Sequence, residues 1–459
     1  MSLLFLNGLM PERHGGFIRA LGSRHVLAGT RLQSLAGEPG LRLLDYPDER
    51  QLASSPWLAG LGALVEARTR ELAASLAGDL AATQAATQSA THAAAGLAAP
   101  PDEHEIAELV RPRVERLLRD ELRFRAFADQ HAVDMVISGS DFSSHSRVVA
   151  RVARRLGLPT LDIEHGFFFS RLAGDWCRVH GRMPLLFASE HVNLDNALEK
   201  ELFEHEQALF PRHDPAESVA FLDLGTPVDT VATQELPREQ ALARLGLDPS
   251  RPQVLLGGSW IEARTANMLL GAQVDAIDLW EDLFRSLAAS ALGRRAQLTI
   301  KLHPADCRPD VLPGVKAACA DLARRHGLPA PLVLPDSLAE AMSACDVVVS
   351  LSFSSILYDA FLMGRPSVVA FPRYLRFGEG EDWLRGSTLP LRAGVCEATV
   401  DGADAWRRVE AFLEPGRRAR FARDREAFAA RYGLRDRTVA AKSAAILDWI
   451  EQRLAVGAG

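Results

Sequence analysis

Two segments of the chain place cationic and hydroxyl side chains at spacings that suit phosphate binding. In the first, K-L-H-P at 301–304, Lys301 and His303 lie two residues apart and therefore project to the same face of a strand. Pro304 ends that strand, so both side chains reach its carboxyl edge. A fixed cation beside a titratable group suits a diphosphate or a phosphate leaving group. A lone histidine is more often structural, but a second phosphate-binding element favours the functional interpretation.

That second element is C-D-V-V-V-S-L-S-F-S-S-I-L-Y-D-A-F-L-M-G-R-P, residues 345–366. A buried strand leads into Ser352, Ser354 and Ser355, and a helix from about 356 to 363 follows. Hydroxyls and unpaired N–H groups at a helix N-terminus form an anion site. Asp359, one turn later on the side of Ser355, could accept hydrogen bonds from a ribose. The alternative is that the serines only cap the helix.

Two weaker signals accompany these segments. The strand at 253–256 runs into a Gly-Gly-Ser turn in which Gly258 and Ser259 permit close approach of a ligand to the backbone. Asp336 follows another short strand and could lie beside a nucleotide base. Capping of the next helix by Asp336 and Ser337 is the more common role of such a pair.

In the first half of the chain, D-I-E-H-G-F-F-F-S-R at 162–171 combines ionisable groups with three phenylalanines. Glu164 and His165 stand at the turn after a buried strand and are candidates for proton transfer. Two other turns after strands carry the remaining candidates, and each is as readily explained as a helix cap. These candidates are Gly15 and Gly16, expected to open a helix, and Asp141 and Ser143.

Short apolar runs must position these turns. Nine of them predict buried strands, at 3–6, 134–138, 160–163, 220–224, 253–256, 297–302, 332–334, 347–351 and 367–370. Runs without alternation suit parallel sheets covered on both faces, and helical stretches between them indicate βαβ units. Because ligands bind at the carboxyl ends of strands in such sheets, all of the candidate turns lie where a ligand is expected.

With 459 residues the chain exceeds one ordinary core, and we expect two doubly wound domains. The first covers 1–229 and includes an Ala/Thr/Gln-rich helical insertion at about 58–100, and the second covers 230–405. Helices at 406–459 are expected to cross back over the first domain.

Composition excludes several classes of protein. A formal net charge of −7 argues against general nucleic-acid binding, and no apolar run is long enough to span a membrane. Five scattered cysteines without a C-x-x-C pair fit a reducing cytosol and give no zinc signature. We therefore expect a cytoplasmic protein, with a peripheral contact with the inner membrane left open. The oligomeric state is not predicted.

Taken together, the motifs resemble those of the GT-B glycosyltransferases, particularly the bacterial capsule-type Kdo transferases, sialyltransferases and CDP-glycerol phosphotransferases. The resemblance rests on K-x-H-P at 301–304, on S-S-x-x-x-D-A-x-x-x-G-R-P at 354–366 and on the acid-x-Gly motif at 164–166. The run at 163–171 is similar to the E-D-G-F-x-R-S-type run of the Kdo transferases. It departs from that run by His165 and by the order Ser170-Arg171. The second-domain motifs cover roughly 250–372, whereas the first domain matches in pattern only.

The resemblance implies two Rossmann-like domains facing across a cleft and transfer of a sugar from a nucleotide donor, CMP- or UDP-linked, to a glycan acceptor. Glu164 would be the general base or a charge stabiliser for the acceptor hydroxyl, with His165 as its rival, and His303 would hold or protonate the leaving phosphate. Arg171, at the acceptor side of the cleft, would neutralise a carboxylate of the donor or of the acceptor, as a Kdo or sialic acid donor would require. The motifs include no D-x-D-like metal site, so we expect neither a metal nor a cofactor. Three alternatives stay open: a UDP-GlcNAc 2-epimerase-like isomerase, a CDP-polyol phosphotransferase and a non-catalytic glycan- or nucleotide-binding protein.

Overall fold

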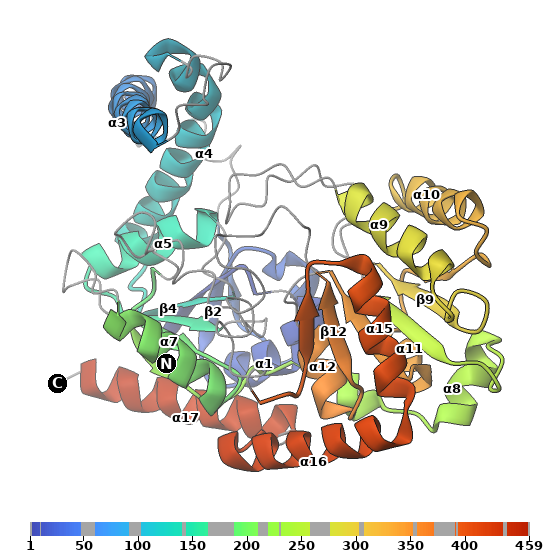
Figure 1. Ribbon diagram of the computed structural model, residues 1–459. Coiled ribbons are helices and arrows are strands. Elements are labelled where there is room, and N and C mark those ends of the chain that lie inside the picture. Colours follow the sequence, from blue (N-terminus) through green and yellow to red (C-terminus); the bar gives the residue numbers. More distant parts are fainter. Residues whose placement is uncertain are drawn as a thin grey trace.

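A computed structural model gives the structure of the protein. It describes residues 2–9, 11–46, 60–90, 102–139, 144–163, 188–209, 219–228, 231–257, 276–302, 307–351, 356–370, 391, 393–434 and 438–457. Within these ranges the chain forms two separate sheets (Figure 1).

The first sheet has seven strands in the order β3-β2-β1-β4-β5-β6-β7, and every neighbouring pair is parallel. This order reverses direction at β1, as in doubly wound sheets. The strands are β1 (Leu3–Asn7), β2 (Val26–Gly29), β3 (Leu43–Leu44), β4 (Met135–Ser138), β5 (Thr160–Ile163), β6 (His191–Asn193) and β7 (Ala220–Leu222).

The second sheet has six parallel strands in the order β10-β9-β8-β11-β12-β13. Here the order reverses at β8, so β8 and β11 lie at the centre. The strands are β8 (Gln253–Gly257), β9 (Gln297–Lys301), β10 (Leu332–Leu334), β11 (Val347–Ser350), β12 (Ser367–Ala370) and β13 (Glu397–Thr399).

Helices cover both faces of each sheet. In the first half these are α1 (Pro11–Gly22), α3 (Leu61–Ala90), α4 (Glu103–Gln130), α5 (Ser144–Arg155) and α7 (Ala197–Leu209). The second half has α8 (Arg238–Leu245), α9 (Ala276–Ala289), α10 (Leu312–Arg325), α11 (Leu338–Ala344), α12 (Ile356–Leu362), α15 (Gly402–Leu413), α16 (Pro415–Tyr432) and α17 (Val439–Gly457). Two short 3-10 helices span Leu32–Leu35 and Val231–Gln234.

The cores follow from the alternation of side chains along the strands. In β1, Leu4 and Leu6 pack on the side of α1 and α17, whereas Phe5 packs on the side of α4 and α5 against Phe124 and Phe127. Both sides are apolar, so the strand sequence is continuously hydrophobic. The second sheet is built in the same way, with α11 and α12 on one face and α9, α10 and α15 on the other.

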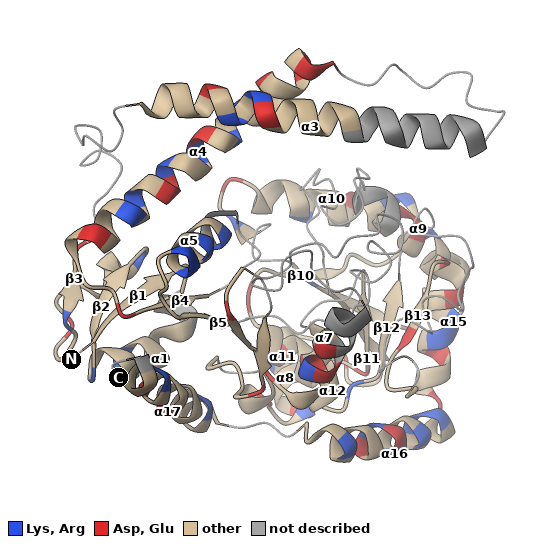
Figure 2. Ribbon diagram, turned by 90° about the vertical axis from the view of Figure 1, so that its left-hand side faces the viewer, with Lys and Arg blue, Asp and Glu red and all other residues tan. Residues whose placement is uncertain are grey.

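Two long helices, α3 and α4, form a hairpin that stands out from the first sheet (Figures 1 and 2). A stripe of buried residues spaced four apart, Leu61, Val65, Thr69 and Ala73, attaches α3 to α4. A capping box starts α4, since the Asp102 carboxylate accepts from the amide of Glu105 and the Glu105 carboxylate accepts from the amide of Asp102.

Helix α17 follows the whole second sheet in the chain but packs on the first sheet. Its Ile446, Leu447 and Ile450 are buried in the same cluster as Leu4 and Leu6, and α17 contacts α1. Figure 1 shows α16 and α17 running along the bottom of the molecule from one sheet to the other.

None of the helices in the described part of the chain has both the length and the apolar character that crossing a membrane requires.

Candidate functional site

The carboxyl edge of the second sheet brings the candidate donor-binding segments together. Gly257, the last residue of β8, is in register with Lys301, the last residue of β9, and with Ser350, the last residue of β11. The segments predicted to bind phosphate therefore begin at three adjacent central strands that end at the same level. This edge, at the point where the strand order reverses, is where doubly wound sheets bind their ligands.

Close packing at Gly257 fixes the start of α12 beside β8. A Cβ atom added to Gly257 would lie 2.9 Å from Cδ1 and 3.2 Å from Cγ2 of Ile356, the first residue of α12. A side chain at position 257 would therefore require the side chain of Ile356 to shift. The N-terminus of the helix that follows the serine pair thus lies at the end of the central strand.

Lys301 is half-buried between the ends of β9 and β10. Its ammonium donates to the carbonyl oxygen of Leu302 at 2.8 Å and to that of Pro335 at 2.7 Å. Burial lowers the pKa of Lys301 below its usual 10.5, while Cys307 and Asp336 act in the opposite direction. An ammonium has three N–H donors, and the two carbonyl oxygens use two of them among the described residues.

Asp336 lies next to this lysine and is exposed to solvent. The following residue, Ser337, has a left-handed backbone (φ 65°, ψ 40°) and makes no side-chain cap to α11. A non-glycine residue in this conformation is uncommon and is found preferentially at functional sites. From the sequence, capping of the following helix is the more common role expected of Ser337. Its side chain does not cap α11.

Asp359 lies in α12 and contacts the chain that joins the two sheets. Its Oδ1 accepts a hydrogen bond of 3.2 Å from the amide of Val231. The carboxylate proposed to meet a ribose is thus bonded to the segment between the two sheets.

The carboxyl edge of the first sheet carries a row of polar side chains. Asn7 is in register with Ser138, and Ser138 with Asp162, across the adjacent strands β1, β4 and β5. All three residues are fully buried. Because side chains alternate along a strand, Asn7 and Ser138 share the face of Phe5, which α4 and α5 cover. Neither the side-chain amide of Asn7 nor the hydroxyl of Ser138 has a hydrogen-bond partner among the described residues.

Glycines bring the ends of these strands together. A Cβ atom on Gly139 would lie 2.9 Å from the carbonyl oxygen of Gly8 and from the amide nitrogen of Leu9. The amide of Gly139 donates to the carbonyl oxygen of Asn7 at 2.9 Å. The turns after β1 and β4 are therefore in direct backbone contact.

Gly15 and Gly16 lie inside α1. The helix begins at Pro11, so the pair occupies its second turn and not its first residues. A proline suits the first position because no intrahelical bond needs its N–H, which explains the earlier start. Gly15 is buried and Gly16 is exposed.

The other candidate residues lie outside the described part of the chain. They are Asp141, Ser143, Glu164, His165, Arg171, Gly258, Ser259, His303, Ser352, Ser354 and Ser355. Their roles remain predictions. The strands that precede them are described, and these fix the edge at which each segment begins.

No family model matches the chain, and no curated protein matches it in sequence. Solved structures do match it in shape. UDP-GlcNAc 2-epimerase from Neisseria meningitidis, bound to UDP-GlcNAc, is 13% identical, covers 98% of this chain and 100% of its own, and has a TM-score of 0.51. The sucrose-phosphate synthase of Thermosynechococcus elongatus is 12% identical, covers 99% and 100%, and has a TM-score of 0.53. A UDP-glucosyltransferase from Polygonum tinctorium is 11% identical, covers 98% of both chains, and has a TM-score of 0.52.

The chain has a GT-B-like fold. Its two parallel sheets with helices on both faces agree with the fold expected from the sequence. At these identities the similarity concerns the fold alone.

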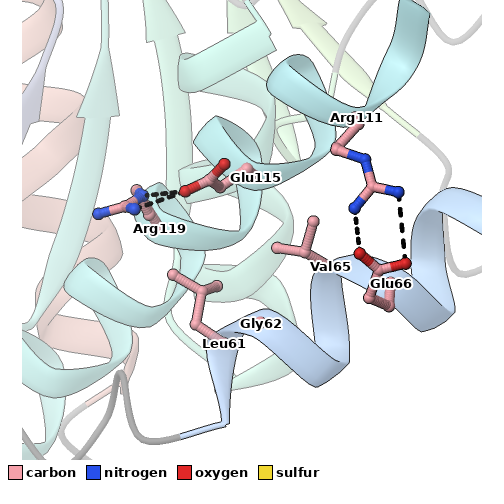
Figure 3. A pocket seen from close by; sticks show the side chains of 7 residues that line it. All are labelled: Leu61, Gly62, Val65, Glu66, Arg111, Glu115 and Arg119. Carbon is pink, nitrogen blue, oxygen red and sulfur yellow. Dashed lines mark hydrogen bonds and ion pairs between the residues drawn. The ribbon is translucent and has the colours of Figure 1, made fainter. Parts of the chain in front are cut away.

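Beyond the two sheets of this GT-B-like fold, the α3–α4 hairpin has a groove of about 470 Å³ (Figure 3). All of its lining residues belong to the hairpin, and none follows a strand of either sheet. Its charged side chains pair with one another, Arg111 with Glu66 and Arg119 with Glu115. The groove is therefore not the candidate active site.

Sequence reasoning did not single out Asn7 and Ser138 and left Asp162 without a functional role. Each lies at or next to the end of an apolar run, where a polar residue is easily taken for the beginning of a loop. A polar residue that ends an apolar strand would have been the signal, since the carboxyl edge is where polar groups meet a ligand.

Proposed function

We propose that the protein is a glycosyltransferase that moves a sugar from a nucleotide donor to a glycan acceptor. The observation that carries this proposal is the register of Gly257, Lys301 and Ser350, from which three phosphate-binding segments leave the sheet side by side. The GT-B-like fold supports it, and two structures of similar shape bear the names of a synthase and a glucosyltransferase.

In the proposed reaction the donor diphosphate or phosphate lies at the edge of the second sheet. Lys301 and the helix terminus after Ser354 and Ser355 offset its charge, and His303 holds or protonates it. Glu164 takes the proton of the acceptor hydroxyl, with His165 as the rival base. The hydroxyl oxygen then bonds to the anomeric carbon as the bond from that carbon to the phosphate oxygen breaks.

The identity of the nucleotide in the donor is the more specific part of the proposal. Arg171, in a run that resembles that of the Kdo transferases, favours an acidic sugar carried by CMP. The names of the similar epimerase and glucosyltransferase include UDP. A thermal-shift screen with CMP, CDP, UDP and GDP separates these options, because the nucleotide that binds the folded protein raises its melting temperature.

The catalytic roles are tested by donor turnover in Glu164→Gln and His303→Ala. Removal of a general base or of a leaving-group contact is expected to slow transfer by roughly 100-fold or more. The exposed Lys316→Met variant is the matched control and should keep full activity. Near-wild-type turnover in both site variants would contradict the mechanism.

The epimerase of similar shape makes isomerisation the alternative function. An isomerase converts its nucleotide sugar without any acceptor. Analysis of the products with and without a glycan acceptor therefore distinguishes the two activities.

A further inference from the structure

The α3–α4 hairpin carries large apolar side chains that are exposed to solvent. Five such side chains are exposed in the described part of the chain, and three of them, Leu64, Leu72 and Leu109, belong to the hairpin. Figures 1 and 2 show that the hairpin projects from the first sheet, so its surface is open to a second molecule. Exposed apolar side chains that gather on one element are typical of an interaction surface.

Two of these leucines lie on one row of side chains along α3. Residues at intervals of four form such rows on a helix surface, and this one, which we call the α3 ridge, consists of Leu64, Arg68, Leu72 and Leu76. Leu64 is 37% exposed, Leu72 is 40% exposed and Leu76 is half-buried. The first three members each come directly before a residue of the buried stripe that attaches α3 to α4. Because successive residues point about 100° apart around a helix axis, the ridge lies on a different and exposed side of α3.

The middle of the α3 ridge carries a pair of opposite charges. Nη1 of Arg68 lies 2.6 Å from Oε2 of Glu71, and the two side chains are 58% and 67% exposed. A pair this exposed contributes little to the stability of the chain, because water competes for both groups. Both charges can therefore pair with opposite charges of a second molecule. Glu71 lies beside the ridge, since it is three residues from Arg68 on the same helix.

This arrangement is complementary to itself under a two-fold rotation. When two α3 helices lie antiparallel and cross midway along the ridge, Leu64 of one copy meets Leu76 of the other. Arg68 of one copy then lies across from Leu72 of the other, next to its Glu71. Leucine thus meets leucine at both ends, and a base meets an acid twice in the middle. A two-fold contact requires this kind of self-complementary surface.

We propose that the α3 ridge and Glu71 form a self-association surface, and that its occupant is the same surface of a second copy of this chain. The charges of the hairpin favour a second copy over an anionic lipid surface, which would attract bases alone. Figure 2 shows the two signs interspersed along α4. Arginines of the hairpin pair with acids: Arg111 with Glu66, Arg119 with Glu115 and Arg125 with Glu121. The inference does not depend on which reaction the two sheets carry out.

The contact is small, because one helix of each copy provides it. Interfaces that bury less than about 1,200 Å² in total are generally weak and transient. We therefore expect a reversible equilibrium between monomer and dimer, with a Kd of roughly 1–100 μM, and not a permanent dimer.

Sedimentation velocity of the full chain across the micromolar range measures this equilibrium. The variants are Leu64→Glu, Arg68→Glu and Glu71→Arg. Leu109→Glu is the matched control, because Leu109 is an exposed leucine of the same hairpin but belongs to α4 and lies outside the ridge. All four positions are exposed, so each variant should fold, which far-UV circular dichroism checks.

We expect Leu64→Glu and either single charge variant to raise the Kd at least roughly tenfold, whereas Leu109→Glu leaves it unchanged. The first variant places a carboxylate against an apolar side chain, and each charge variant brings like charges together at two symmetric points. An equimolar mixture of Arg68→Glu and Glu71→Arg should associate like the wild type, because one variant then carries two acids on the surface and the other two bases. Pairing within one chain does not explain recovery on mixing.

A wild-type chain that stays monomeric across this range would overturn the proposal, as would a mixture that associates no better than its components. Equal weakening by Leu109→Glu and Leu64→Glu would do the same, because the contact would then not be specific to the ridge. Flotation of a monomeric wild type with phosphatidylglycerol vesicles, lost in Leu64→Glu, would assign the ridge to a lipid surface instead.

Discussion

The ammonium of Lys301 is held by two backbone carbonyl oxygens in a half-buried position. Carbonyl dipoles only partly replace the water that burial removes, and the pKa of the lysine is lowered as a result. In the protein without ligand the charged form is therefore costly near neutral pH. As the pH rises through the lowered pKa, Lys301 in the folded protein loses its proton, whereas Lys301 in the unfolded chain keeps its proton to higher pH. The folded protein is therefore relieved of the cost of the buried charge, and its stability rises over this pH range.

We predict that Lys301→Met weakens nucleotide binding by roughly 10- to 100-fold, because it removes a charge-assisted hydrogen bond to phosphate. The ratio of wild-type to variant affinity should shrink as the pH rises through the lowered pKa, where Lys301 loses its charge. Isothermal titration calorimetry across an alkaline pH series measures both effects. Lys316→Met, on the exposed face of α10, is the control. An affinity ratio that does not change with pH would contradict the role of the charge.

At the scale of elements, tight contacts between strand ends shape both candidate edges. In the first sheet the ends of β1 and β4 touch through Gly8 and Gly139, and in the second Ile356 of α12 sits on Gly257. At Gly139 the neighbouring atoms are backbone, which cannot rotate away as a side chain can.

We predict that Gly139→Ala destabilises the protein by about 1–3 kcal/mol, because its Cβ would be forced against the backbone of Gly8 and Leu9. Gly314→Ala is the opposite case, since no atom lies within 4 Å of its added Cβ in α10. It should stabilise the protein by about 0.4–1 kcal/mol. Chemical denaturation of the two variants measures the difference, and equal effects would show that the Gly8–Gly139 contact does not constrain the fold.

The strands with clear apolar runs could be predicted from the sequence, and the weak ones could not. The predicted runs at 160–163, 332–334 and 367–370 coincide with β5, β10 and β12. By contrast, β6 has a single valine between His191 and Asn193, and β3 has only two residues. Such strands, like β13, need the hydrogen-bonding edge of a neighbouring strand, and a local pattern does not record this. Strand β2 is different, because Val26, Leu27 and Ala28 form a short apolar run that the sequence analysis did not include.

In the candidate site, too, local sequence patterns predicted some features and missed those that depend on distant residues. Patterns in the sequence placed Lys301 in a strand and Asp359 in the first turn of a helix, where the structure has them. They did not reveal that Lys301 bonds Pro335 or that Asp359 bonds Val231, because these partners lie 34 and 128 residues away in the chain. The buried row of Asn7, Ser138 and Asp162 depends in the same way on strand register.

At the scale of the whole molecule, the first sheet depends on α17. Ile446 and Ile450 are fully buried in the cluster that contains Leu4 and Leu6, and Lys442 of the same helix pairs with Asp195. The stability of the first sheet is thus tied to a helix that follows the second sheet in sequence.

We predict that Ile446→Ala lowers the free energy of unfolding by about 2–5 kcal/mol, the cost of a cavity in a packed core. Val456→Ala is the control within α17, since Val456 is 74% exposed and should change stability little. Thermal and urea denaturation of both variants provides the comparison. A similar small effect in the two would mean that α17 is not part of the first core.

The position of α17 also has a consequence for how the protein is made. A ribosome delivers the strands of the first sheet early, but it delivers Ile446, Leu447 and Ile450 only after the entire second sheet has been synthesised. The first core cannot be completed as its own strands emerge, although domains commonly fold in that order. For the same reason a chimaera that exchanges the first domain needs two junctions, because α17 must be exchanged together with the strands of the first sheet.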